Sequence, residues 1–226
     1  AALLLEELAQ ADRALAATSS GRIGLARFNS LSTPRARNLL RSELLSAGLR
    51  APAARWLDEA LRQLSTVDAV SETCIRSADG EIHAYRGELH VCRRPSAVPA
   101  GDLPWCGEEE LPWGADRVTF TPTTGAGINR YRLSGAPLRI TSRQGGERLQ
   151  PDPRRPLRTL KNLLQEAAVP PWERFRLPLL WSGEHLVWVA GIGVDAAFAC
   201  PPGEPGLLLA WQRVVPPPAG HLFSQR

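Results

Sequence analysis

The sequence predicts an α+β protein: a small N-terminal helical domain that includes a β-hairpin, followed by a C-terminal domain of mixed strands and helices. In the first third of the chain, apolar residues recur at three- and four-residue steps, which is typical of amphipathic helices. Residues 81–92 alternate instead, and Arg86-Gly87 lies mid-way as a candidate hairpin turn. The last hundred residues combine short apolar runs with one leucine-rich basic segment.

Three helices are expected before the hairpin. The second begins near Thr33-Pro34, a hydroxyl cap followed by proline, and stops at Gly48. The first ends at Ser19-Ser20-Gly21, and its expected inward stripe consists of Leu3, Leu4, Leu8, Ala11 and Leu15. The third begins at Pro52, and its stripe consists of Trp56, Leu57, Ala60, Leu61 and Leu64.

Residues 95–117 are rich in proline and glycine, which both helices and sheets tolerate poorly. We therefore expect a connector or surface loop, held against a domain by Trp105 and Trp113. The predicted organisation is a helical domain over 1–94, a connector over 95–117, a C-terminal domain over 118–215 and a tail over 216–226, after Pro216-Pro217-Pro218 ends the fold.

The C-terminal domain is expected to hold six strands and one principal helix. The helix spans Leu157 to Ala167, with Leu157, Leu160, Leu163 and Leu164 inward. Pro170-Pro171 begins a further helical turn through Arg176. The expected strands are residues 118–120, 131–133, 138–142 and 207–213, and a hairpin of residues 179–181 and 186–190 turns at Ser182-Gly183.

Positive charge is concentrated in this domain. Nine basic and four acidic residues lie between Arg139 and Arg176, so the segment carries +5 whereas the whole chain carries +4. A localised positive field favours an anionic partner, most simply the phosphates of a nucleic acid. The residues predicted to contact RNA phosphate are Arg143, Arg148, Arg154, Arg155, Arg158, Lys161, Arg174 and Arg176.

Composition excludes several other classes. The sequence has neither a run of 18 apolar residues nor a signal-peptide pattern, so no membrane association is expected. Cys74, Cys92, Cys106 and Cys200 show no C-x-x-C spacing, which argues against a zinc site and favours a reducing cytoplasm. The four histidines are too dispersed to nominate as ligands or as a base. The absence of methionine indicates a piece of a longer protein.

One block of the C-terminal domain carries a resemblance. A basic helix at 158–164 leads into QEAAVPPW at 165–172, then RFRLPLL at 174–180 and GIGVD at 191–195. This order resembles the C-terminal domain of the tRNA(Ile)-lysidine synthetase family. STPRARNLLRSELLSAGL at 32–49 and YRGELHV at 85–91 look like the family's helical substrate-binding domain. The resemblance covers roughly three-quarters of the chain.

The resemblance implies an enzyme that uses ATP and Mg²⁺ to adenylate the wobble cytidine of isoleucine tRNA (CAU anticodon), after which lysine displaces AMP to leave lysidine. The family's Ser-Gly-Gly-x-Asp-Ser phosphate loop is absent from this sequence. We therefore expect this chain to bind and orient isoleucine tRNA beside its own N-terminal catalytic domain, with no catalytic residue, cofactor or metal of its own.

Simpler interpretations stay open. The basic segment could be a solvated surface, as most charge runs are, and so could Arg35, Arg37 and Arg41 on the second helix. Gly145-Gly146 reads as a turn whose amides could approach phosphate, and Glu147 as an ion-pair partner of Arg148. A second functional hypothesis is a structural module for homodimerisation or domain docking. A third, an independent hydrolase or transferase, lacks any nucleophile, base and acid constellation.

Overall fold

Helices and antiparallel sheets follow one another along the chain, which confirms the predicted α+β class. The structure is a computed structural model that describes residues 2–50, 52–67, 73–94, 101–133 and 135–213. These residues fall into two compact units, 2–94 and 101–213, each with its own hydrophobic core. The predicted tail over 216–226 lies outside the described residues.

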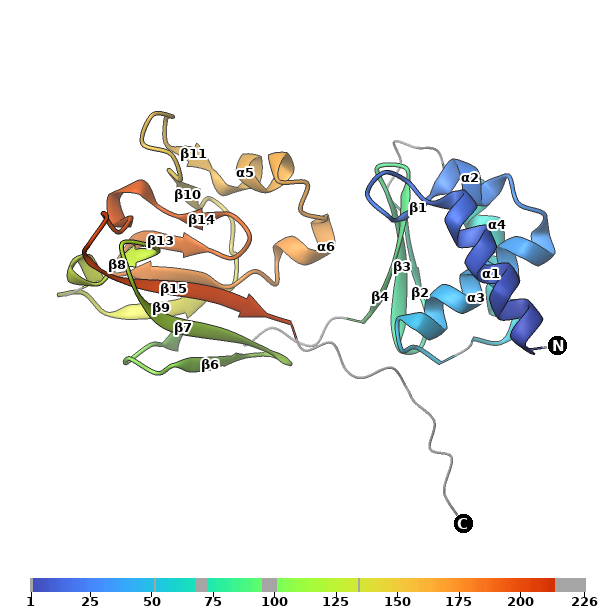
Figure 1. The fold of residues 1–226 in the computed structure, drawn as a ribbon, viewed down its shortest axis with the longest axis horizontal. Helices are drawn as coiled ribbons and strands as arrows, with labels where there is room; N and C mark the ends of the chain where they lie inside the picture. The colour runs from blue at the N-terminus through green and yellow to red at the C-terminus, as the bar shows by residue number, and fades with distance from the viewer. Residues whose placement is uncertain (1, 51, 68–72, 95–100, 134, 214–226) are drawn as a thin grey trace, which may run out of the picture. The chain divides into compact units, whose positions relative to one another are not determined.

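In the first unit the helices cover one face of a four-stranded antiparallel sheet (Figure 1). The sheet has the strand order β1-β4-β3-β2. In chain order the elements are α1 (Ala2–Ala16), β1 (Ile23–Gly24), α2 (Leu25–Asn29), α3 (Thr33–Ser46), α4 (Ala54–Ser65), β2 (Thr73–Arg76), β3 (Gly80–Tyr85) and β4 (Glu88–Arg93).

Local sequence accounts for most of these boundaries. Pro34 lies in the first turn of α3, where its missing N–H costs nothing, and Gly48 follows the helix at φ 70°, which glycine adopts without strain. Leu57, Ala60 and Leu64 are the buried residues of α4, as predicted. The predicted hairpin is confirmed as β3 and β4, and Arg86 and Gly87 between them both have positive φ. The short elements α2 and β2 were not predicted.

Helix α1 departs from its predicted orientation. The five leucines of the helix are exposed, among them Leu3 at 74% and Leu4 at 69%, whereas Ala9, Asp12 and Ala16 are buried. Ala11 is exposed as well, so the predicted inward stripe is wrong at every position. Asp12 is buried because it accepts hydrogen bonds from the guanidinium of Arg35 on α3, including one of 3.2 Å from Nε. This ion pair turns the small-residue face of α1 toward the core.

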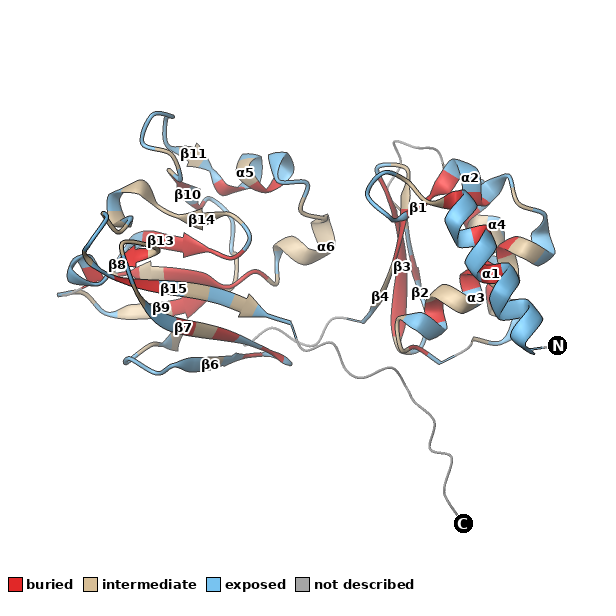
Figure 2. Ribbon diagram, in the orientation of Figure 1, coloured by how far each residue is buried: buried red, intermediate tan, exposed pale blue. Residues whose placement is uncertain are grey.

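The two faces of the first sheet differ in chemistry. The helix-facing side contributes Ile75, Ile82, Ala84 and Leu89 to the core. Because side chains alternate along a strand, the other side carries the intervening residues. Register places Cys74 opposite His83 on β2 and β3, and His83 opposite His90 on β3 and β4. Figure 2 shows that burial is concentrated on the sheet and on the helix surfaces next to it.

The second unit contains two sheets and a two-stranded ribbon. One sheet has the order β14-β13-β12-β9-β5, the other β6-β7-β15-β8, and β10 pairs with β11. Its strands are β5 (Leu103–Pro104), β6 (Glu110–Trp113), β7 (Asp116–Thr124), β8 (Ile128–Asn129), β9 (Leu138–Thr141), β10 (Arg148–Leu149), β11 (Arg158–Thr159), β12 (Leu179–Ser182), β13 (His185–Val189), β14 (Gly193–Val194) and β15 (Pro205–Gln212). Its helices are η1 (Arg130–Leu133), α5 (Leu160–Glu166), α6 (Pro171–Arg174) and η2 (Ala196–Phe198).

One core serves the whole second unit. It takes Val118 and Leu207 from one sheet, Ile140 and Val187 from the other, and Leu164 from α5. The hairpin of β12 and β13 is confirmed, as are the strands predicted near 118–120, 138–142 and 207–213.

The predicted connector is wrong for much of its length. Residues 103–104 and 110–113 form β5 and β6, and β7 begins at Asp116. Trp113 is only 3% exposed and its indole N–H donates to the Arg176 carbonyl oxygen at 2.6 Å, so the expectation that tryptophan packs this segment against a domain holds. Residues 95–100 lie outside the described part of the chain.

Two further predictions need correction. Residues 131–133 form the 3₁₀ helix η1 instead of a strand. The principal helix starts at Leu160, because Arg158 and Thr159 pair with β10 and the Thr159 hydroxyl caps α5 by accepting from the Asn162 amide. Leu157 therefore precedes the helix and is 47% exposed, whereas Leu160 and Leu164 are fully buried as predicted.

Candidate RNA interface

The basic segment forms a small ribbon that leads into α5 (Figure 1). Gly145 and Gly146 precede it with φ of 105° and 86°, as the glycine pair predicts. The Leu149 side chain is fully buried and anchors β10, and the Leu160 amide donates to the Glu147 carbonyl oxygen at 2.8 Å. Packing and backbone hydrogen bonds therefore hold the ribbon and the first turn of α5 together as one unit.

Glu147 closes the turn before the ribbon. Its side chain is buried, and its Oε1 accepts from the amides of Gln144 and Gly145, both at 2.6 Å. Its Oε2 lies 3.4 Å from Nε of Arg143, so Glu147 pairs with Arg143 and the expected pair with Arg148 is wrong. Because the Gly145 amide donates to this carboxylate, this amide is not available to a phosphate.

Four of the eight predicted contact residues are exposed around the ribbon. Arg148 lies on β10, Arg154 and Arg155 lie in the loop between the strands, and Lys161 lies in the first turn of α5. Only weak internal contacts restrain this group: Arg155 lies 3.7 Å from Asp152, and a nitrogen of Arg148 lies 3.5 Å from the Leu157 carbonyl oxygen. We call these four residues the cationic ribbon.

The other four are engaged in internal contacts. Arg143 has a side chain only 11% exposed, and its guanidinium lies 5.9 Å from the Phe175 ring centroid. Arg174 donates to the Val169 carbonyl oxygen at 2.8 Å, and Arg176 pairs with Asp116 at 3.4 Å. These three arginines make intramolecular contacts that stabilise the fold of the second unit.

Arg158 is the fourth engaged residue. It makes two hydrogen bonds to the Glu166 carboxylate, one of them 2.7 Å from Nη1 to Oε2. These hydrogen bonds raise the pKa of Arg158 and lower the pKa of Glu166, because each group stabilises the charged form of the other. The pair links β11 to the last turn of α5.

The arginines of α3 also fall into two groups, those in ion pairs and one that is exposed. Arg35 is paired with the buried Asp12 and Arg37 with Asp58 on α4, whereas Arg41 is exposed. The first two thus join helices to one another. The helical unit consequently presents a weaker cationic surface than the arginine count on α3 indicates.

A cleft beside the ribbon was not predicted from the sequence. It encloses about 400 Å³, and its lining includes Arg148, Leu157, Trp181, His185, Asp195 and Phe198. Asp195 accepts hydrogen bonds from the amides of Gln150 and Ala197, so it acts as the expected cap and links η2 to the end of β10. The lining comes from three separate stretches of sequence. The cleft could not be predicted because only the tertiary fold brings these stretches together.

None of the helices in the described residues combines the length and apolar character that crossing a membrane requires.

The two units and the cationic ribbon define a class: a two-domain α+β protein whose C-terminal domain presents a small basic surface. Comparisons with known proteins identify the family. The model for the TilS substrate binding domain matches residues 24–90, and the model for the TilS substrate C-terminal domain matches residues 138–211. The chain belongs to the tRNA(Ile)-lysidine synthase family, and the matched regions are the substrate-binding and C-terminal domains of that family.

Curated relatives agree with the family models. The tRNA(Ile)-lysidine synthase of Nitrosomonas europaea is 41% identical over 93% of this chain and 46% of its own length. That of Aromatoleum aromaticum is 44% identical over 81% of this chain and 43% of its own length. The chain thus spans about half the length of these relatives. A match to a crystal structure of a TILS C-terminal domain covers 44% of this chain and 85% of the matched chain, with 22% sequence identity and a TM-score of 0.38.

Proposed function

We propose that this chain is the tRNA-binding portion of a tRNA(Ile)-lysidine synthase, and that the cationic ribbon contacts the phosphate backbone of isoleucine tRNA. The observation that carries the proposal is the exposure of Arg148, Arg154, Arg155 and Lys161 on one ribbon–helix unit within the matched C-terminal domain. Guanidinium groups can donate two hydrogen bonds to one phosphate, and cations at the surface release counterions when they bind RNA.

The internal contacts of the other arginines refine the proposed site. Arg143 and Arg176 keep their ion pairs and support the fold, and Arg158 fixes the ribbon against α5. The proposed contact surface is therefore smaller than the eight predicted residues. The neighbouring cleft adds the aromatic faces of Trp181 and Phe198, against which an unpaired base could stack.

In the complete enzyme, the proposed role of the chain is to hold the tRNA while a separate N-terminal domain ligates lysine to the wobble cytidine. ATP and Mg²⁺ would bind in that catalytic domain, in the cytoplasm. The five exposed leucines of α1, at the start of this chain, support a protein contact there, and we propose that the catalytic domain covers them.

Titration of the 226-residue chain with isoleucine tRNA tests the proposal. With about three to four phosphate contacts, the logarithm of affinity should fall against the logarithm of salt concentration by about 0.7 to 0.9 per contact. A variant with Arg154→Glu, Arg155→Glu and Lys161→Glu should raise the Kd at least about tenfold and reduce that slope.

Arg117→Glu is the matched control, because Arg117 is exposed on β7 and pairs with Glu110. Equal affinity in the triple variant and the control would exclude the ribbon as the contact surface. A Kd for tRNA that does not change with salt concentration would exclude recognition of the phosphate backbone.

A structural role is the second candidate, and the exposed leucines of α1 are the observation that favours it. If they mediate homodimerisation, the chain should sediment as a dimer, and Leu3→Ser with Leu4→Ser should convert it to a monomer. If the chain is monomeric and binds tRNA, homodimerisation through the α1 leucines is excluded.

A further inference from the structure

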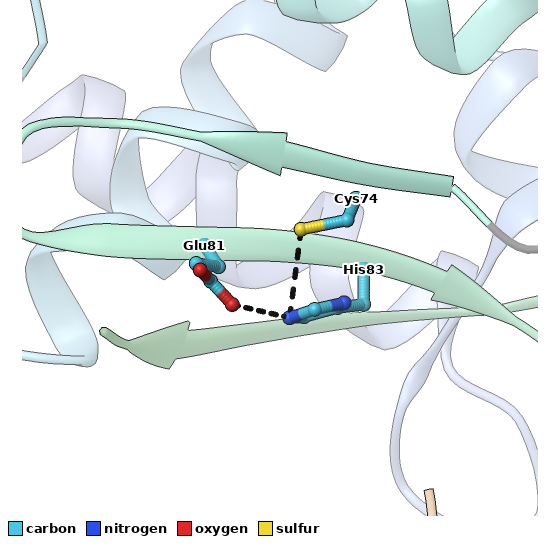
Figure 3. Close-up of side chains that lie close together, drawn as sticks. All are labelled: Cys74, Glu81 and His83. Atoms are coloured by element: carbon cyan, nitrogen blue, oxygen red, sulfur yellow. Dashed lines mark hydrogen bonds and ion pairs between the residues drawn. The ribbon is translucent and has the colours of Figure 1, made fainter. Parts of the chain in front are cut away.

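Three side chains capable of binding a metal ion converge on the polar face of the first sheet. Cys74 on β2, Glu81 on β3 and His83 on β3 each direct one ligand atom toward a common point, and these atoms all lie within 4.8 Å of one another (Figure 3). His83 Nε2 lies 3.0 Å from Glu81 Oε2 and 4.0 Å from Cys74 Sγ. We propose that this cluster is a binding site for Zn²⁺ or a closely similar divalent transition-metal ion.

The spacing fits a tetrahedral ion. Zinc binds nitrogen and oxygen at about 2.0–2.2 Å and sulfur at about 2.3 Å, so ligand atoms around a tetrahedral zinc lie roughly 3.3–3.8 Å apart. The two observed distances fall on either side of this range. Small rotations of the side chains would therefore complete a three-ligand site without moving the strands.

Register explains why these residues meet. Cys74 and His83 are directly opposite one another on adjacent antiparallel strands, and Glu81 is two residues from His83 on the same strand and hence on the same face. His83 lies nine positions after Cys74 in the sequence, a spacing that forms no recognised metal motif. The pairing of β2 with β3 creates the cluster.

The donor set selects the ion. A thiolate and an imidazole favour zinc and related transition metals over Mg²⁺ or Ca²⁺, which prefer oxygen ligands. Glu81 is 8% exposed and His83 5% exposed, so two ligands are held in place, whereas Cys74 is exposed and leaves an entry path for the ion. A water molecule would occupy the fourth position, as in other zinc sites with three protein ligands.

A neighbouring arginine orients the Glu81 carboxylate. Arg76 Nε lies 3.2 Å from Glu81 Oε1, so this arginine orients the carboxylate and leaves Oε2 facing His83. The Cys74 thiol would lose its proton to solvent as the metal–thiolate bond forms.

The same geometry argues against a nucleophilic triad. In a triad the base uses one ring nitrogen for the nucleophile and the other for the acid. Here Cys74 and Glu81 both approach the same nitrogen, Nε2 of His83, so no second ring nitrogen is directed at either partner. Convergence of three donors on one point is the arrangement that a bound cation requires.

Cobalt and zinc titrations of the 226-residue chain test the site. We expect one zinc ion per chain, with a proton released on binding, and a thiolate-to-cobalt charge-transfer band when Co²⁺ replaces zinc. Cys74→Ser should abolish the band and weaken zinc binding at least about 100-fold, because loss of a ligand costs at least as much as loss of a residue that orients one. His83→Gln should weaken binding to a similar extent.

Cys92→Ser is the matched control. Cys92 lies opposite Glu81 on β4, and its thiol donates to the Glu81 backbone carbonyl oxygen at 3.7 Å. This variant should bind zinc as the parent chain does, with the cobalt band intact. Circular dichroism checks that Cys74→Ser, which changes an exposed side chain, remains folded. The proposal is overturned if the parent chain binds no zinc, if Cys74→Ser binds it equally well, or if Cys92→Ser loses it to the same extent.

Discussion

A single buried carboxylate organises the turn that precedes the cationic ribbon. Glu147 accepts hydrogen bonds from two backbone amides and forms an ion pair with Arg143, so two buried donors and one buried charge depend on it. Glu147→Ala should lower the free energy of unfolding of the second unit by about 1–3 kcal/mol, because buried donors lose their acceptor. Urea denaturation measures this, and Glu184→Ala, at a side chain 94% exposed, is the control expected to change little. Equal effects from the two variants would contradict the role assigned to Glu147.

The Arg158–Glu166 pair offers a second test at the scale of the residue. Hydrogen bonding to Arg158 lowers the pKa of Glu166 in the folded state. A lowered carboxyl pKa contributes stability above the unfolded-state pKa, and this contribution is lost as pH falls through the folded-state value. Arg158→Ala should return the Glu166 pKa toward its ordinary value in an NMR titration of the carboxyl carbon. An unchanged pKa would show that the pair is not formed in solution.

At the scale of the element, helix α1 shows that leucine content alone does not determine which face is buried. Leu3→Ser with Leu4→Ser should change the free energy of unfolding of this chain by no more than about 0.5 kcal/mol per substitution, because both side chains are exposed. Leu39→Ala on α3 removes a fully buried side chain and should cost about 2–5 kcal/mol. A large loss in the serine variant, measured by urea denaturation, would show that α1 buries its leucines in solution.

Elements whose ends carry strong local signals could be predicted from the sequence. Pro34 and Gly48 delimit α3, and Arg86-Gly87 marks the hairpin because both positions adopt positive φ. Residues 131–133 could not be assigned correctly, because the triplet Tyr-Arg-Leu is too short for its periodicity to distinguish a strand from a 3₁₀ turn. The orientation of α1 escaped prediction because it depends on Asp12 meeting Arg35, which lies 23 residues further along.

The candidate sites were predictable to different degrees. Charge density located the basic segment, and the exposed members of the cationic ribbon lie within it. Sequence could not separate Arg154 from Arg143, because the partner of Arg143 is set by the turn at Glu147. The Cys74–His83 pair was missed because it arises from strand register, and β2 itself carries only a short apolar pattern.

At the scale of the whole molecule, the two units have separate hydrophobic cores. We expect two unfolding transitions in calorimetry, since each core can be disrupted on its own. Leu39→Ala should shift only the transition of the first unit, and Leu164→Ala, at the centre of α5, only that of the second. A single transition that both variants shift equally would show that the units unfold as one.

The single lysine of the chain provides a site for selective chemical labelling next to the cationic ribbon. Lys161 is the sole lysine of the chain and is exposed on the first turn of α5, so its side chain offers the one primary amine besides the α-amino group. An acylating reagent would label this amine and the α-amino group, which mass spectrometry of the peptides tells apart, and the reaction at Lys161 should be slowed by transfer RNA if the nucleic acid shields that amine. Footprinting by mass spectrometry can therefore map occupancy of the ribbon in the unsubstituted chain.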